Sequence, residues 1–132
     1  MRKKQLLFIL LCLLQLSACE AANPEPEPPR SVRLYYFHDT PCGSCDGAKE
    51  FYELFHEKIS DDEDEYPYVI IPVNVFQSDG LDQLEKTADE YGISRENLEF
   101  PLLIINGNAF SGLESIANNL REAFLAVGQE II

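Results

Sequence analysis

The sequence is poor in the residues that most often build metal sites and nucleic-acid interfaces. Its 132 residues include no tryptophan, two histidines and four cysteines, and 10 basic residues stand against 23 acidic ones. Because nucleic-acid binding depends on a basic footprint, this imbalance argues against a nucleic-acid partner. There is also no glycine-rich phosphate loop, and no serine–histidine–acid set can be assigned.

Long apolar runs are absent except near the N-terminus. There a basic start (Arg2, Lys3, Lys4) precedes an apolar run at residues 6–16. These eleven residues are too few for a membrane span, which takes about 17 to 25. A basic start followed by a short apolar run is typical of a secretory signal. The sequence therefore predicts that residues 1–18 are a signal peptide.

The end of this run, LSAC at residues 16–19, resembles the lipobox of bacterial lipoproteins. The resemblance implies cleavage before Cys19 and lipidation of Cys19, with the protein held on the extracytoplasmic face of the cell membrane. At least two acyl chains would make the anchor stable. The alternative is ordinary signal cleavage that leaves Cys19 unmodified.

Cleavage at this position changes both the cysteine count and the charge. Cys12 is lost with the signal and Cys19 is lipidated, which leaves Cys42 and Cys45 in a compartment that permits disulfides. Three of the ten basic residues and none of the acidic ones are removed, so the net charge becomes −16.

Residues 19–30 are predicted to be a spacer that begins at the lipidated cysteine. The part EAANPEPEPPR, residues 20–30, contains four prolines and is expected to be an extended polyproline II segment. At about 3.1 Å per residue it reaches roughly 34 Å. A domain this acidic is repelled by anionic lipid, so the spacer keeps it clear of the membrane.

Residues 31–132 carry the periodicities of one folded domain. The apolar patterns predict seven elements in the order β-α-β-α-β-β-α. They are a strand at 32–37, a helix at 45–59, a strand at 68–76, a helix at 81–91, strands at 102–106 and 109–111, and a last helix from about Glu114 or Ser115 to Gly128.

Connection rules then give the topology. The first two strands, joined through a helix, should be parallel, and the hairpin signalled by Asn106-Gly107 adds antiparallel strands. Gly92 is placed to end the second helix. Pro72 cannot donate a ladder hydrogen bond, so its strand should lie at an edge or contain a bulge. The prediction is an α/β fold with a four-stranded mixed sheet flanked by helices on both faces.

Cys42 and Cys45 lie between the first predicted strand and the first predicted helix, and their spacing allows three interpretations. A structural zinc ion takes four ligands, usually from two pairs of closely spaced cysteines. The sequence has one such pair, and His38 and His56 are the other candidate ligands. A structural disulfide across so short a loop stabilises by about 2 kcal/mol at most. A redox couple has a mechanism, because a helix N-terminus favours a thiolate. In it Cys42 is the exposed nucleophile and Cys45 resolves the mixed disulfide.

This placement of CGSC at residues 42–45 resembles thioredoxin-like proteins. A second segment, YGISRENLEFPLLIINGNAFSG at residues 91–112, resembles the family's run from a glycine–apolar pair to a cis-proline, a strand, a turn and a second strand. The resemblance covers residues 31–128 and implies a thioredoxin-like fold in which Pro101 is the cis-proline. Pro101, Phe100 and Pro41 would line the substrate groove, without a metal or organic cofactor.

The sequence departs from the family at three positions. Pro41 replaces the tryptophan that usually precedes the first cysteine, and Phe100 replaces a threonine- or valine-type neighbour of the cis-proline. Tyr36 stands where many thioredoxins carry a buried acid. His38 and Asp39 are either substitutes for that acid or ordinary loop residues.

We therefore expect a lipid-anchored, extracytoplasmic thiol–disulfide oxidoreductase, acting as a reductase. Its expected partners are exported proteins that contain cysteines, a membrane redox partner, and the bilayer through Cys19; the protein is expected to be a monomer. The alternative is a thioredoxin-like module whose cysteine pair senses redox state and controls partner binding without turnover.

Overall fold

The computed structural model describes residues 30–41 and 47–132. The signal peptide, most of the spacer, Cys19, Cys42 and Cys45 lie outside these residues. The described elements follow the predicted order. They are β1 (Val32–His38), α2 (Lys49–Ile59), β2 (Tyr68–Asn74), α3 (Gly80–Tyr91), β3 (Leu102–Ile105), β4 (Asn108–Ser111) and α4 (Leu113–Ile131).

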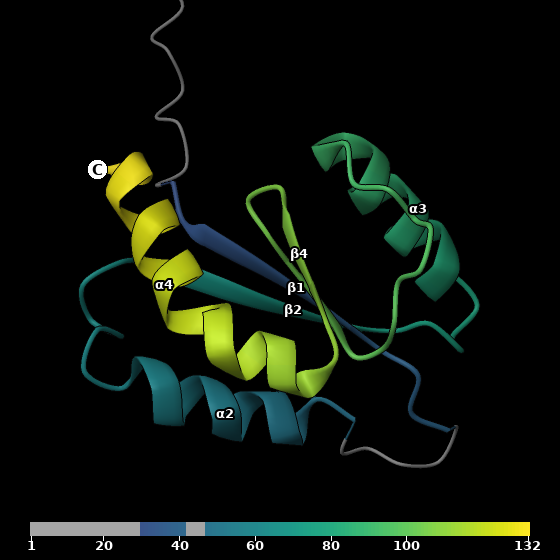
Figure 1. Cartoon of the computed structure of the whole chain (residues 1–132), viewed down its shortest axis with the longest axis horizontal. Helices are drawn as coiled ribbons and strands as arrows, with labels where there is room; N and C mark the ends of the chain where they lie inside the picture. The colour runs from purple at the N-terminus through teal and green to yellow at the C-terminus, as the bar shows by residue number, and fades with distance from the viewer. Residues whose placement is uncertain (1–29, 42–46) are drawn as a thin grey trace, which may run out of the picture.

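The strands form one mixed sheet in the order β2-β1-β3-β4. β1 is parallel to β2, while β3 is antiparallel to both β1 and β4. Helices α2 and α4 cover one face of the sheet and α3 lies on the other (Figure 1). The predicted α/β class and four-stranded mixed sheet flanked by helices are confirmed, and the arrangement is broadly consistent with a thioredoxin-like one.

The central strand β1 is buried on both faces because its residues alternate between two cores. Val32, Leu34 and Tyr36 belong to the core under α2 and α4, and Phe37 belongs to the core under α3. The larger core contains an aromatic cluster in which Phe55 packs edge-on to Phe124, with ring centroids 5.8 Å apart. Such pairs contribute about 0.5–1.5 kcal/mol beyond the area that they bury.

The expectation that Pro72 sits at a sheet edge is confirmed, because β2 is an outer strand. The amide of Val75 donates to the carbonyl of His38 at 2.9 Å, so the odd-numbered residues of β2 point their amides toward β1. Even-numbered residues then point theirs outward, and the missing N–H of Pro72 is among these. The proline therefore costs the sheet no hydrogen bond and leaves the outer edge a poorer template for another strand.

Both glycine-based turn predictions are confirmed. Gly92 ends α3 in the left-handed region, with φ 66°. Asn106 and Gly107 both have positive φ, 42° and 83°, as the two-residue turn of a hairpin requires. The second strand is shorter than predicted and ends at Asn74, because the amide of Gln77 turns back to the carbonyl of Asn74 at 3.1 Å.

The prediction that Gly128 ends the last helix is wrong, since α4 continues to Ile131. Gly128 is buried, and a Cβ atom there would overlap the ring of Tyr66, which packs directly against the helix backbone. The glycine is therefore a contact point between α4 and the segment before β2. Close packing requires a glycine here, whereas a helix stop would have required a left-handed residue.

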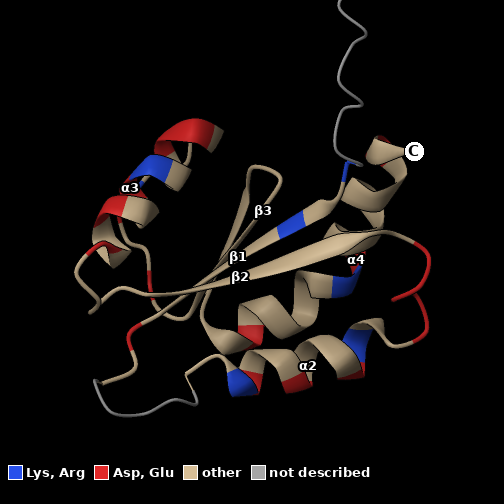
Figure 2. Ribbon diagram, turned by 180° about the vertical axis from the view of Figure 1, so that it is seen from behind, with Lys and Arg blue, Asp and Glu red and all other residues tan. Residues whose placement is uncertain are grey.

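The two ends of the described chain lie at the same end of the molecule. Arg30 precedes β1 beside the C-terminus of α4, while the far end of β1 leads to Pro41 (Figure 1). Acidic residues line the turn between α2 and β2 and the outer faces of α2 and α3 (Figure 2). Among the described residues, none of the helices has the length and apolarity needed to cross a membrane.

The contact between Gly128 and Tyr66 yields a stability prediction. Gly128→Ala should lower the free energy of unfolding by about 1–3 kcal/mol, because the added methyl overpacks against the ring. This loss should exceed the gain of up to about 1 kcal/mol in helix propensity. Urea denaturation measures it, with the exposed Gln129→Ala as a neighbouring control. An unchanged or higher stability for Gly128→Ala would show that the ring moves aside freely.

Candidate functional site

The candidate site lies where β1 ends and the chain passes through CGSC to α2. Cys42 and Cys45 lie outside the described residues, but Pro41 and Gly47, which flank the segment, are described. His38 is the last residue of β1, so its interpretation as an ordinary loop residue is wrong. Pro41 is exposed, and Asp39 is exposed in the short connection before it.

The Phe100–Pro101 peptide bond is cis, as the family resemblance implies. Phe37 pairs with Leu102, so the next residues outward on these adjacent strands are His38 and Pro101. Pro101 is therefore at the same edge of the sheet as the end of β1. Its carbonyl accepts a hydrogen bond from the amide of Gly112 at 2.8 Å, which ties it to the end of β4.

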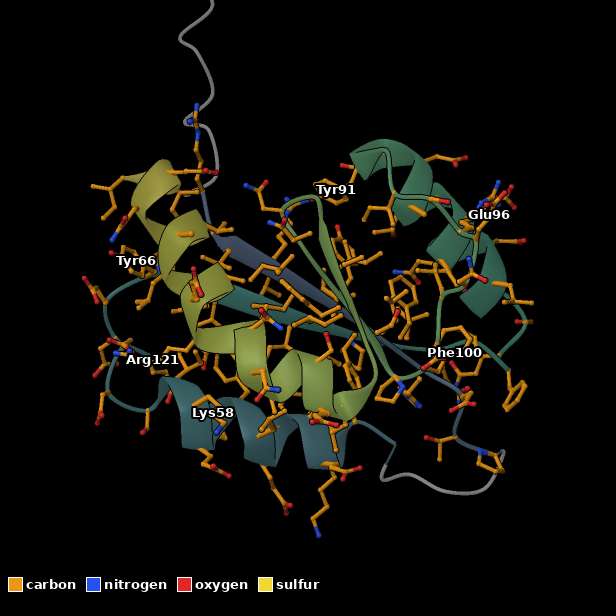
Figure 3. The ribbon with its side chains drawn as sticks, in the orientation of Figure 1. Lys58, Tyr66, Tyr91, Glu96, Phe100 and Arg121 are labelled. Carbon is orange, nitrogen blue, oxygen red and sulfur yellow. The ribbon has the colours of Figure 1, made fainter. Side chains whose placement is uncertain are left out.

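Phe100 is half-buried and packs against the core under α3. It lies at the edge of the sheet where the trace of β1 runs out toward Pro41 (Figure 3). Only the exposed part of its ring can serve a groove, because the rest fills the space between the sheet and the chain after α3. The structure thus brings Phe100 and Pro101 to the expected edge.

A hydrogen-bond network holds the connection that follows β1. The Nδ1 atom of His38 lies 2.9 Å from the hydroxyl of Thr40. The carbonyl of Thr40 accepts from the side-chain amide of Asn74 at 2.9 Å. The Oδ1 atom of Asn74 accepts from the amide of Phe76 at 3.0 Å, which fixes the orientation of this side chain. Residues from the ends of two neighbouring strands therefore hold the segment just before Pro41.

Gly47 packs against His38 and Thr40 of this network. A Cβ atom at Gly47 would overlap the imidazole of His38 and the hydroxyl of Thr40. The backbone at Gly47 therefore rests directly on the two side chains that follow β1. Only glycine permits so close an approach without displacing one of them.

Tyr36 connects this network to the core. Its ring stacks on Phe51 of α2 with centroids 4.3 Å apart, and on His38 with centroids 5.9 Å apart. Burial, followed by the negative charges of Glu50 and Asp39, raises the pKa of Tyr36 to about 12. The phenol is therefore neutral near pH 7 and cannot accept a proton there as a buried carboxylate could.

Unlike the phenol of Tyr36, the imidazole of the neighbouring His38 can accept a proton. Burial lowers the pKa of His38, and the nearby charge of Asp39 opposes that effect. The neutral imidazole is therefore the resting form at neutral pH. In this form one ring nitrogen accepts a hydrogen bond and the other donates, so His38 can hold Thr40 and still exchange a proton.

Helix α2 begins at Lys49 and not at residue 45 as predicted, because Gly47 and Ala48 form a turn before it. Ala48 is its N-cap and supplies no side-chain hydrogen bond to the free amides of the first turn. These amides and the helix dipole favour a negative charge nearby. Glu50 in the first turn contributes a competing negative charge.

Other concave or ligand-like features of the described chain lie elsewhere. A shallow groove of about 240 Å³ lies between β4 and α4. It is lined by Asn108, Phe110, Asn119, Glu122, Ala123 and Ala126. Among the described residues there is no group of three or more His, Cys, Asp or Glu side chains that could hold a metal ion.

Sequence reasoning missed three residues of the network: Thr40, Gly47 and Asn74. Thr40 and Asn74 act through contacts between the ends of neighbouring strands, and no local pattern reveals such contacts. Gly47 had a local signal, because a glycine near a helix start suggests a close backbone approach. The sequence did not indicate which side chain it approaches.

The lowered pKa of His38 gives a pH prediction with a definite sign. Between that pKa and the ordinary value of about 6.5, the unfolded chain binds more protons than the folded protein. Wild type should therefore lose stability relative to His38→Asn as the pH falls through this window. Urea midpoints at about pH 7.5, 6 and 5 measure the difference. A difference between wild type and His38→Asn that stays constant with pH would contradict the burial argument.

Comparison of the chain with protein-family models, with curated proteins and with solved structures found no match.

Proposed function

We propose that the chain is a lipid-anchored, extracytoplasmic thiol–disulfide oxidoreductase of the thioredoxin-like class that reduces disulfides in exported proteins. The supporting observation combines the position of the cysteines along the sequence with the position of Pro101 in the sheet. The CGSC segment joins Pro41 to Gly47 at the end of β1, and the cis Phe100–Pro101 bond lies at that same edge of the sheet. In the thioredoxin-like proteins that the sequence resembles, a cysteine pair at this point of the chain carries out disulfide exchange.

The proposed reaction transfers two electrons from the protein to the substrate. The Cys42 thiolate attacks one sulfur of a substrate disulfide and releases the other as a thiolate, which forms a mixed disulfide. The Cys45 thiolate then attacks the Cys42 sulfur and releases the second substrate thiol. The protein is left with a Cys42–Cys45 disulfide, and a membrane dithiol partner returns it to the reduced state.

The charges near the site favour the reduction of substrate disulfides over their formation. A helix N-terminus favours a thiolate near it, and negative charges such as those of Asp39 and Glu50, which act on Tyr36, disfavour one. The Gly-Ser dipeptide between the cysteines adds no positive charge. A thiolate that is only modestly stabilised leaves the reduced form reactive, which characterises a reductant; strong oxidants stabilise their reduced form much more.

Anchoring through Cys19 is a second part of the proposal, and the LSAC match at residues 16–19 supports it. The spacer would join the domain at Arg30, at the opposite end of β1 from His38 (Figure 1). A tether at that end leaves the cysteine pair free to meet partners. Substrates and the membrane partner would both approach at the far end of the sheet.

The catalytic roles can be tested with substitutions of the two cysteines. The reduced protein should reduce the disulfides of insulin, and Cys42→Ala should abolish turnover because the attacking thiolate is gone. Cys45→Ala should accumulate a mixed disulfide with substrate, detected by mass spectrometry. A matched control is Ser44→Ala, which keeps both thiols.

Two other outcomes would revise the proposal. Wild-type protein that forms the disulfide yet does not turn over insulin would favour the redox-sensing module. An equilibrium potential against glutathione near −120 mV, the value of a strong periplasmic oxidant, would overturn the reductase direction. In that case the cysteine roles would still stand.

The anchor is tested separately from catalysis. Wild-type protein expressed in a bacterium should partition into the detergent phase and carry the added mass of lipid on Cys19. Cys19→Ser should be soluble and unlipidated, because serine has no thiol to modify. Cys12→Ser serves as the control, since that residue is removed with the signal. Equal partitioning of all three proteins without a lipid mass would contradict the anchor.

A further inference from the structure

The two outer edges of the sheet are protected to different degrees. β2 lies at one edge, where Pro72 removes an outward N–H group. β4 lies at the other edge, and its residues Asn108–Ser111 include no proline and no charged side chain. Because an edge without such residues can pair with another strand, β4 is the place where this sheet can accept one.

The hydrogen bonds of β4 show which of its backbone groups face outward. The amide of Gly112 donates to the carbonyl of Pro101 at 2.8 Å, so the even-numbered residues of β4 direct their backbone groups toward β3. The N–H and C=O groups of Ala109 and Ser111 then point away from β3. Among the described residues, β3 is the only strand that pairs with β4. These outward groups are therefore able to pair with an added strand.

The groove between β4 and α4 runs beside this edge. Its volume of about 240 Å³ is below the range of about 300–1,000 Å³ that is usual for small-molecule clefts, so it suits a single long side chain. Its apolar lining comes from Phe110, Ala123 and Ala126. Side chains alternate between the two faces along a strand, so alternate residues of an added strand would point to the face that holds the groove.

The polar lining of the groove accepts hydrogen bonds. The side-chain nitrogen of Asn119 donates to the carbonyl of Ser115 at 2.7 Å, which leaves the Oδ1 atom of Asn119 as an acceptor. Glu122 is exposed, and within the described part of the chain its carboxylate has no hydrogen bond or ion pair. An apolar wall beside such acceptors suits the aliphatic stem and the charged head of a lysine or arginine.

The basic residue of α4 does not neutralise Glu122. Arg121 is bound instead to Asp62, with Nε and Oδ2 2.8 Å apart, beside the turn between α2 and β2 (Figure 3). β3 and β4 contain no basic residue. The groove therefore offers a negative charge to whatever strand pairs with β4.

We propose that β4 and this groove bind an extended basic segment of a partner protein, which joins the sheet as a further strand and places a lysine or arginine side chain beside Glu122. Backbone pairing with Ala109 and Ser111 holds the segment, and the groove selects the basic side chain. The chain has 23 acidic and 10 basic residues, a balance that attracts a basic segment and repels a second copy of the chain. The inference goes beyond the proposed redox function and does not depend on the cysteine pair.

The test measures binding of capped peptides to the full-length protein labelled with nitrogen-15. The probe is a seven-residue peptide of alternating threonine and valine with lysine at its centre. Matched peptides carry norleucine or glutamate in place of the lysine, and a fourth keeps the lysine but is methylated on its backbone nitrogens. The protein variants are Glu122→Gln and, as a control, Glu90→Gln, which removes an exposed carboxylate from α3 on the other face of the sheet.

Binding of the lysine peptide should slow hydrogen exchange at the amides of Ala109 and Ser111. The amides of Asn108 and Phe110 should change little, because they already bond to β3. Glu122→Gln should weaken binding of the lysine peptide by about fivefold, as expected for an ion pair at a surface, and leave the norleucine peptide unaffected. Glu90→Gln should bind both peptides as wild type does.

The matched peptides separate the two parts of the proposal. The glutamate peptide should bind more weakly than the norleucine peptide, and the methylated peptide should not bind, because its N–H donors are gone. Equal affinity for the lysine, norleucine and glutamate peptides would refute the basic preference. Binding of the methylated peptide at the affinity of its parent, or no binding of the lysine peptide at all, would refute strand addition. A dimer in sedimentation without peptide, with the amides of Ala109 and Ser111 already protected, would replace the partner by a second copy and overturn the proposal.

Discussion

The burial of β1 on both faces is the constraint on which the rest of the structure depends. This strand pairs with β2 on one side and β3 on the other, and Tyr36 and Phe37 are buried in opposite cores. A slip of one residue would exchange these two rings between the cores, so the register is strongly specified. With the register fixed, His38 and Pro101 must emerge at the same edge of the sheet. Core packing therefore determines that these two residues of the candidate site lie at one edge of the sheet.

Tyr36 stands where many thioredoxins, which the sequence resembles, carry a buried acid, and this changes how such a site could handle protons. A phenol with a pKa of about 12 does not accept a proton at neutral pH. Its ring instead provides an aromatic surface on which His38 stacks. His38 lies two residues further along β1 and therefore points to the same side of the sheet as Tyr36. A titratable group is retained on that side, displaced by one pleat and more exposed to solvent.

Much of the fold was predictable because its signals are local. Asn106-Gly107, Gly92 and Pro72 each have a backbone requirement that few alternatives satisfy, and each occupies the predicted position. Gly128 was misassigned because a glycine near a helix end has two meanings, a left-handed stop or a close contact. The deciding partner, Tyr66, lies 62 positions earlier in the sequence. The same limit applies to the site, where the bond from Asn74 to Thr40 spans 34 residues. The position of Pro101 was predictable by resemblance, whereas the support under the cysteine segment depends on such distant contacts.

The charge of the domain and the position of its ends bear on how a tethered reductase could work. The proposed attachment of the spacer at Arg30 and the end of β1 at His38 are eight residues apart, which is about 26 Å in an extended strand. The proposed spacer would reach roughly 34 Å if extended, so it would be long enough for the domain to turn that end toward a membrane partner. The acidic residues marked in Figure 2 would disfavour contact of the domain with anionic lipid, which would leave that end available to the proposed substrates as well. Acidic charge also destabilises a thiolate, so under the proposed function the same charge that would keep the domain off the membrane would make its cysteine pair a better electron donor.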